Sequence, residues 1–140
     1  MTPTFPGLIE WKPAYNIHIA SIDEQHRMLV SIIRHLQEAM LEGRTRHVVA
    51  PLFSAMNLYT KFHFAYEEQL LSDHGYPAVE SHHELHAGLI ATLQELESKY
   101  VGASLSAGAP LIQFLRTWLL SHIGAHDREY AGFLRGKGVC

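Results

Sequence analysis

Two pairs of metal-ligand side chains, each four residues apart, constrain the fold of this chain more than any other feature of its sequence. His63 and Glu67 form the first pair, and His82 and His86 form the second. At about 3.6 residues per turn, residues four apart lie one above the other on the same face of an α-helix. Residues 75–77, between the pairs, contain a glycine and a proline, which break helices. The stretch therefore predicts two helices that each present two ligands to one site.

Hydrophobic residues at helical spacing predict a further helix before this stretch. It is expected to begin near Ser21, where Glu24 completes a capping box, and to end near Gly43. The helix that carries His63 is expected to begin between residues 46 and 50, because Pro51 is tolerated only in a first turn. In both helices the histidines lie within the apolar stripe.

The third helix is expected to reach Tyr100, and a fourth to carry Leu111 to Ile123. Gly132, Gly136 and Gly138 are expected to mark a loose tail after it. Four amphipathic helices with short or moderate connections predict an all-α fold, an up-down-up-down four-helix bundle over about residues 21–134. Residues 1–20, which are irregular but partly apolar, are expected to form an N-terminal arm packed on the bundle. The whole chain, 1–140, is expected to be a single domain. Four aromatic residues are expected in the core: Tyr59, Phe62, Tyr66 and Trp118.

Composition and charge exclude several functions and locations. The net charge is −3 with both signs interspersed, so the chain lacks the basic patch that nucleic acid or an anionic membrane surface requires. No apolar run approaches the roughly 18 residues of a membrane span, and no secretory signal is evident. Cys140 is the only cysteine, so no disulfide can form within the chain. We therefore expect a cytoplasmic protein without a membrane span or a nucleic-acid partner.

Histidine is the compositional outlier, with 11 of 140 residues. Every predicted helix places at least one histidine on its inward stripe, and these are His26, His63, His82, His86 and His122. Five imidazoles and a carboxylate without partners would destabilise a core, whereas a metal ion would satisfy them. The pattern therefore indicates a metal site. The other histidines are expected at the surface or beside the site, and Glu68 is expected to be solvated or charge-paired.

The remaining ligand of the fourth helix is ambiguous by spacing alone. His126 lies four residues after His122, whereas Asp127 lies five residues after it, or about 140° around a regular helix. Two metal ions need bridging groups, however, and a second carboxylate bridges better than an imidazole. A local widening of the helix, as in a π-bulge, would bring Asp127 onto the same face. Asp127 is therefore our hypothesis for this ligand.

Four motifs in order resemble those of the hemerythrins, specifically the single-domain bacteriohemerythrins. The motifs are Asp23-x-Gln25-His26, His63-x3-Glu67-Glu68, Gly75-Tyr76-Pro77 followed by His82-x3-His86, and Trp118-Leu119-x2-His122-x4-Asp127. The resemblance extends from about residue 8 to residue 134 and agrees with the choice of Asp127. Leu71 departs from the methionine that many bacterial relatives have near this position, which concerns only the lining of the pocket.

The resemblance implies a non-haem di-iron centre with an oxo or hydroxo bridge. Glu67 and Asp127 would bridge both irons. The terminal ligands would be His82, His86 and His122 on one iron, and His26 and His63 on the other.

A ligand count indicates where a small molecule could bind. These ligands and one oxygen bridge fill about eleven of the twelve positions of two octahedral irons, which leaves one position open on the iron with two histidines. Dioxygen is the ligand that the resemblance implies there. Apolar walls would exclude water from that position. The residues expected to line this oxygen pocket are Ile22, Trp118, Leu119 and Ile123.

The expected function is reversible dioxygen binding for oxygen carriage, storage or delivery, with no enzymatic activity. An oxygen-consuming protein would then be the recipient. One alternative is a sensor of oxygen, redox state or nitric oxide that acts through a partner protein. Another is a di-iron oxidase or ferroxidase, although no Glu-x-x-His of this chain is placed as a ligand pair of the kind typical of those bundles.

Overall fold

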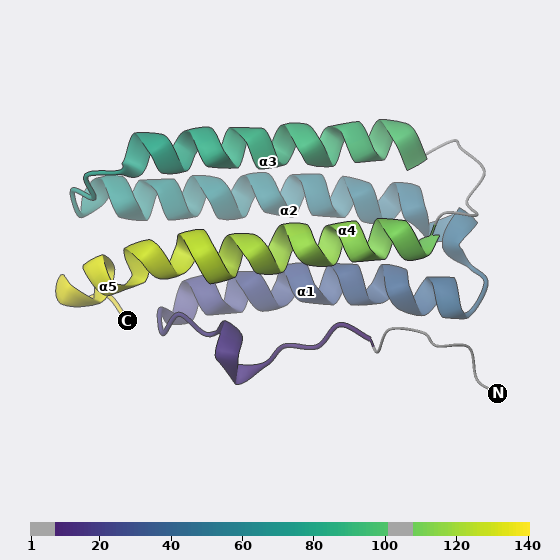
Figure 1. The fold of residues 1–140 in the computed structure, drawn as a ribbon, viewed down its shortest axis with the longest axis horizontal. Helices are drawn as coiled ribbons and strands as arrows, with labels where there is room; N and C mark the ends of the chain where they lie inside the picture. The colour runs from purple at the N-terminus through teal and green to yellow at the C-terminus, as the bar shows by residue number, and fades with distance from the viewer. Residues whose placement is uncertain (1–7, 101–107) are drawn as a thin grey trace.

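The computed structural model describes residues 8–100 and 108–140, and within them the chain is all-helical. Its elements in order are η1 (Pro13–Tyr15), α1 (Ala20–Leu41), α2 (Thr45–Asp73), α3 (Val79–Tyr100), α4 (Gly108–Ser121), the π-helix η2 (His122–Asp127) and α5 (Arg128–Gly136). Because α4, η2 and α5 follow one another without a break, they form the fourth rod of the bundle (Figure 1). The predicted all-α, up-down-up-down four-helix bundle is confirmed.

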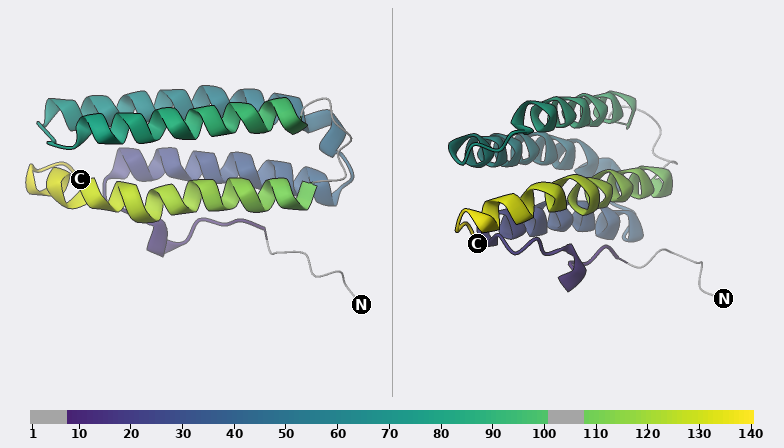
Figure 2. Two further views of the ribbon diagram at one scale, coloured as in Figure 1. Left: turned by 45° about the horizontal axis from the view of Figure 1, so that its top comes forward. Right: turned by 60° about the vertical axis from the view of Figure 1, so that its left-hand side comes forward.

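The four rods are held together mainly through α1 and α2. Helix α2 packs against both α1 and α3, and α1 also packs against α4. The two further views show the rods lying side by side along one common direction (Figure 2). Among the described residues, no helix combines the length and the hydrophobicity needed to cross a membrane.

The described part of the N-terminal arm, from residue 8 onward, packs on α1 through polar and apolar contacts. Ile9 and Ile17 are buried, and the backbone N–H of Ile9 donates to Gln37 Oε1 over 2.8 Å. The carboxylate of Asp23 accepts from the backbone N–H groups of Ile17 and His18. The predicted capping box is wrong, because α1 already begins at Ala20 and its N-cap residue makes no side-chain hydrogen bond. Asp23 instead holds the end of the arm in place, just before α1 begins.

The start of α2 and the end of the fourth rod also differ from expectation. Helix α2 begins at Thr45, so Pro51 lies inside the helix, where it has no N–H to donate to the carbonyl of His47. At the other end, α5 continues to Gly136 with Ala131 and Leu134 buried. The predicted loose tail is therefore wrong as far as Gly136, since apolar packing keeps this segment helical.

Two apolar clusters fill the interior. The larger one includes Leu29, Phe64 and Leu119, and the smaller one includes Leu71 and Tyr130. Along α1, α2 and the fourth rod, the predicted ligands lie at the junction of the two clusters, so apolar packing on both sides fixes the helices that carry them. Phe62 and Tyr66 were expected in this core, but they are exposed. Their positions on α2 turn them to the solvent side, whereas Trp118 is buried and Tyr59 half-buried.

Candidate metal centre

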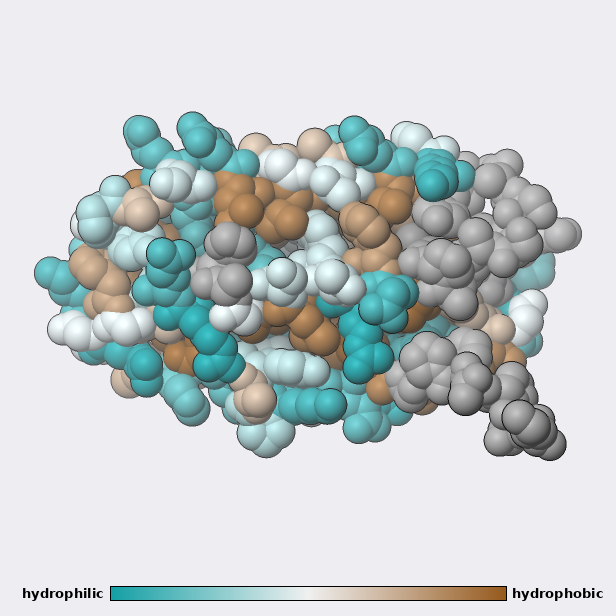
Figure 3. All heavy atoms as spheres, viewed as in Figure 1, coloured by the Kyte–Doolittle hydropathy of each residue, from teal (hydrophilic) through white to brown (hydrophobic). Residues whose placement is uncertain are grey.

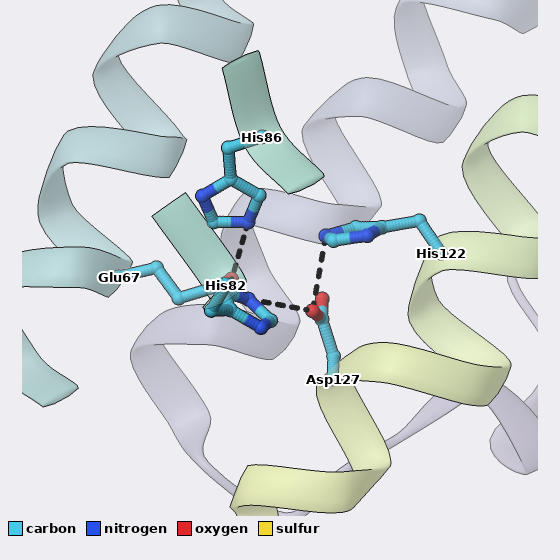
Figure 4. A group of neighbouring side chains, drawn as sticks. All are labelled: Glu67, His82, His86, His122 and Asp127. Carbon is cyan, nitrogen blue, oxygen red and sulfur yellow. Dashed lines mark hydrogen bonds and ion pairs between the residues drawn. The ribbon is translucent and has the colours of Figure 1, made fainter. Parts of the chain in front are cut away.

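Seven buried side chains from all four rods meet at one place in the bundle. They form two groups, and within each group the ligand atoms all lie within 4.8 Å of one another. Glu67 and Asp127 belong to both groups. The other members are His82, His86 and His122 in the first group, drawn with the carboxylates in Figure 4, and His26 and His63 in the second.

A π-helical segment places His122 and Asp127 on the same side of the fourth rod. The six residues from His122 to Asp127 form η2, whose wider turn offsets the extra residue between the two side chains. Both side chains are buried, and His122 Nε2 lies 3.0 Å from Asp127 Oδ1. The widening invoked from the sequence is therefore present. The prediction that His126 lies at the surface falls outside the described side chains.

Glu67 lies close to three histidines of the cluster. Its Oε1 atom accepts from His82 Nε2 over 2.5 Å and lies 3.1 Å from His86 Nε2, and its Oε2 atom lies 3.1 Å from His63 Nε2. Its two oxygens thus face histidines of both groups. This position between the groups is the arrangement that a bridging carboxylate requires.

Several of the ligand nitrogen and oxygen atoms lie close together without forming hydrogen bonds. His26 Nε2 lies 2.8 Å from Asp127 Oδ2, yet neither atom has a hydrogen bond to any described residue, and the same holds for His63 Nε2 and Glu67 Oε2. Each buried polar group left in this state costs about 1–3 kcal/mol. Imidazole and carboxylate lone pairs that converge in this way are suited to divalent metal ions. The residues therefore fit a metal centre.

Burial and the close contacts among these side chains shift their pKa values. Burial would raise the pKa of Glu67, but contacts from the surrounding histidines outweigh it and hold that pKa well below its ordinary value. The pKa of Asp127 is likewise lowered, since contacts from His122 and His26 outweigh burial and the charge of Glu67. Burial lowers the pKa of His63, whereas contact with Asp127 raises that of His122 despite burial. Ionised carboxylates and a neutral His63 are the forms that bind metal.

A narrow closed space adjoins the histidines of the smaller group. Its walls are formed by His26, Leu29, His63, Phe64, Trp118, Leu119 and His122, and it is too narrow to admit a water molecule. Trp118 and Leu119 were predicted to line an oxygen pocket. Ile22 and Ile123, also predicted there, are buried but do not line this space, and their place in an oxygen pocket stays a prediction. The sequence did not indicate the contribution of Leu29 and Phe64, because both fit an ordinary core position.

An open groove of about 300 Å³ lies on the other side of Trp118 and His122. It runs between α3 and α4 and is lined by Leu85, Leu89, Thr92, Phe114, Thr117, Trp118, Ser121 and His122. Hydrophobic side chains gather over α3 and α4 on the face shown in Figure 3. Trp118 and His122 line both the groove and the closed space. These two side chains therefore separate the interior of the site from the surface.

Comparison with known proteins identifies the family. The sequence model described as the hemerythrin HHE cation binding domain matches residues 18–134. The chain belongs to the hemerythrin family. The bacteriohemerythrin of Stenotrophomonas maltophilia is 33% identical over 129 residues, which cover 89% of this chain and 80% of the relative. That of Pseudomonas aeruginosa is 32% identical over 125 residues, with the same coverage.

More distant hemerythrins share the same organisation. The myohemerythrin of Theromyzon tessulatum is 23% identical over 92% of this chain and 96% of its own length. The crystal structure of a hemerythrin variant superposes with a TM-score of 0.78 at 23% identity, over 89% of this chain and 95% of that one. This likeness shows a common fold. A hemerythrin fold with a buried cluster of histidines and carboxylates is thus established for this chain.

Two polar side chains outside the cluster hold histidines of this hemerythrin in place. His63 Nδ1 donates to Gln25 Oε1 over 2.6 Å, and His86 Nδ1 donates to Glu68 Oε2 over 2.9 Å. The other oxygen of Glu68 is bonded to the Nδ1 atom of the exposed His83. Glu68 therefore accepts hydrogen bonds from two histidines, and its side chain is 21% exposed. The contact of Gln25 with His63 could not be predicted from the sequence, in which Gln25 is marked only by its place next to His26 in the family motif.

Proposed function

We propose that this hemerythrin binds dioxygen reversibly at a di-iron centre and serves in oxygen carriage, storage or delivery. In this proposal His82, His86 and His122 hold one iron, His26 and His63 hold the other, and Glu67 and Asp127 bridge them. The observation that carries the proposal is that the two groups of ligand residues share two carboxylates and no other residue. This arrangement suits two metal ions that are bridged by both carboxylates.

The unequal donor groups support a function in binding a small ligand. The larger group has five members and the smaller one four, so an ion in the smaller group retains more room for an additional ligand. Both histidines of that smaller group, His26 and His63, form walls of the closed space, together with His122 of the larger group. When bound, a di-iron pair supplies the two electrons that reversible dioxygen binding requires.

The surrounding residues would keep this ligand position dry and oriented. Leu29, Phe64 and Leu119 present apolar walls, which exclude the water and protons that promote irreversible oxidation. Gln25 fixes the ring of His63 by accepting from its Nδ1 atom, so that Nε2 faces the cluster. None of these residues supplies an acid or base at the apolar position. This supports binding rather than enzymatic turnover.

The iron content and the visible spectrum test the proposal. The purified protein, loaded anaerobically with Fe(II), should contain about two irons per chain, as expected for two ligand groups. A colour should appear on exposure to air and fade when dioxygen is removed again. Irreversible conversion to the oxidised form would contradict the carrier function and favour a sensor or an oxidase. Sustained oxidation of added Fe(II) would identify a ferroxidase.

A further inference from the structure

The two groups of ligand residues differ in the hydrogen bonds made by histidine nitrogens that face away from the cluster. In the larger group, His86 Nδ1 donates to the carboxylate of Glu68, whereas in the smaller group His63 Nδ1 donates to the amide of Gln25. Both histidines thereby present Nε2 to the cluster, each 3.1 Å from an oxygen of Glu67. The geometry toward the cluster is therefore similar. The difference is one of charge, because one acceptor is anionic and the other is neutral.

The carboxylate of Glu68 is held where its charge acts on His86. The side chain of Glu68 is 21% exposed, and that of His86 is 1% exposed, so solvent screens their interaction only in part. His83, whose ring is 68% exposed, binds the second oxygen of Glu68 and restricts its rotation. A carboxylate on the outer nitrogen makes the imidazole a better electron-pair donor to a cation. An amide at the same place orients the ring without adding charge.

We propose that Glu68 makes the three-histidine position the tighter of the two metal positions, so that ions load in a fixed order. The first ion binds with His82, His86 and His122, and the second binds with His26 and His63. The first ion also encounters both shared carboxylates with their full charge, whereas the second meets carboxylates already partly neutralised. This inference rests on the proposed metal centre but not on dioxygen binding. Glu68 acts through His86 and is a positioning residue.

Competition with a chromogenic chelator tests this order on the full chain. Zn²⁺ is the probe, because it takes the same ligands as iron and has no redox chemistry. The zinc-loaded protein should release its ions in two steps with different dissociation constants. The variant Glu68→Gln, which keeps the shape of the side chain and removes its charge, should weaken the tighter step by about 10- to 100-fold. The weaker step should be much less affected.

Two further variants separate a local effect from a general one. Glu84 is exposed on α3, two residues before His86, so Glu84→Gln removes the same charge away from the cluster and should change neither constant. Gln25→Glu should tighten the weaker step, because it places a carboxylate on the outer nitrogen of His63. The double variant Glu68→Gln/Gln25→Glu should narrow or reverse the difference between the steps. A purely structural role for Glu68 would not allow a carboxylate at position 25 to narrow or reverse the difference between the two dissociation constants.

The possible failures are distinct. If Glu68→Gln changes the tighter step no more than Glu84→Gln does, or acts on the weaker step, the role of Glu68 is wrong. If the unmodified protein releases two ions with a single constant, loading in a fixed order is wrong while the two-ion centre stands. If the protein binds no ion or only one, the proposed di-iron centre fails as well. Circular dichroism of each variant establishes that the helices are retained.

Discussion

Leu119 lies between the apolar core and the closed space beside His26 and His63, and it is 2% exposed. The substitution Leu119→Asn would place a polar amide in that wall, where it favours the entry of water and donates hydrogen bonds. We expect the iron-loaded protein to oxidise irreversibly in air several-fold to about tenfold faster. The decay of the dioxygen-dependent colour measures this rate.

The matched control for this residue is Leu115, one turn earlier on the same helix. Leu115 is also buried, but it does not line the closed space. Leu115→Asn should destabilise the fold by a similar amount, typically a few kcal/mol, because it too buries an amide. It should leave the oxidation rate unchanged. Equal acceleration by both substitutions would show that loss of stability, and not the wall of the site, controls oxidation.

At the scale of the element, the π-helix η2 brings Asp127, five residues after His122, to the cluster. Deleting Gly124, an exposed residue within η2, would leave the histidine and the aspartate four residues apart. A regular α-helix places such a pair on one face. We therefore expect this deletion variant to retain two metal ions per chain, as measured by elemental analysis. The π-helix would then be one solution to the spacing and not a requirement of the chemistry.

An insertion at the same place in η2 is the opposite change and should have the opposite effect on metal binding. Inserting one alanine after Gly124 would place the two ligands six residues apart, or about 240° around an α-helix. This variant should lose at least one ion per chain while its helix content stays the same by circular dichroism. Full metal content in the insertion variant would mean that Asp127 is not needed as a ligand.

For the whole molecule, the buried cluster couples metal binding to folding. Five imidazoles and two carboxylates lie in the interior, and several of their atoms have no hydrogen bond to any described residue. A metal that binds only the folded state stabilises it by about 2.7 kcal/mol at a free concentration near 100 times its Kd. Each kcal/mol raises the Tm by roughly 2–8 °C for domains of this size range. Removal of the metal should therefore lower the Tm measurably.

Thermal unfolding followed by circular dichroism would measure this effect. Adding Fe(II) without oxygen, or Zn²⁺, should restore the Tm of the metal-free protein. Mg²⁺ should not, because it prefers oxygen ligands and the cluster is rich in imidazole. An unchanged Tm in the metal-free protein would indicate that the cluster is satisfied without metal, against the proposed centre.

The sequence alone determined the features that depend on near neighbours along a helix. The spacing of His63 with Glu67 and of His82 with His86 predicted paired ligands, because residues four apart share a helix face whatever the surroundings. The apolar stripes predicted the bundle for the same reason. Even the π-helical widening between His122 and Asp127 could be predicted from the sequence. A spacing of five residues conflicts with a regular helix when both side chains must face one site.

Only the tertiary structure decided the features that depend on how the rods are rotated against one another. Asp23 and not Ser21 engages the arm, and Phe62 faces solvent, because packing and not periodicity selects the buried part of an amphipathic face. The contacts of Gln25 with His63 and of Glu68 with His86 join different helices. The spacing of residues along one helix gives no information on which side chains of two different helices come into contact. The charges beside each histidine, and hence the proposed order of metal loading, therefore follow only from the folded arrangement.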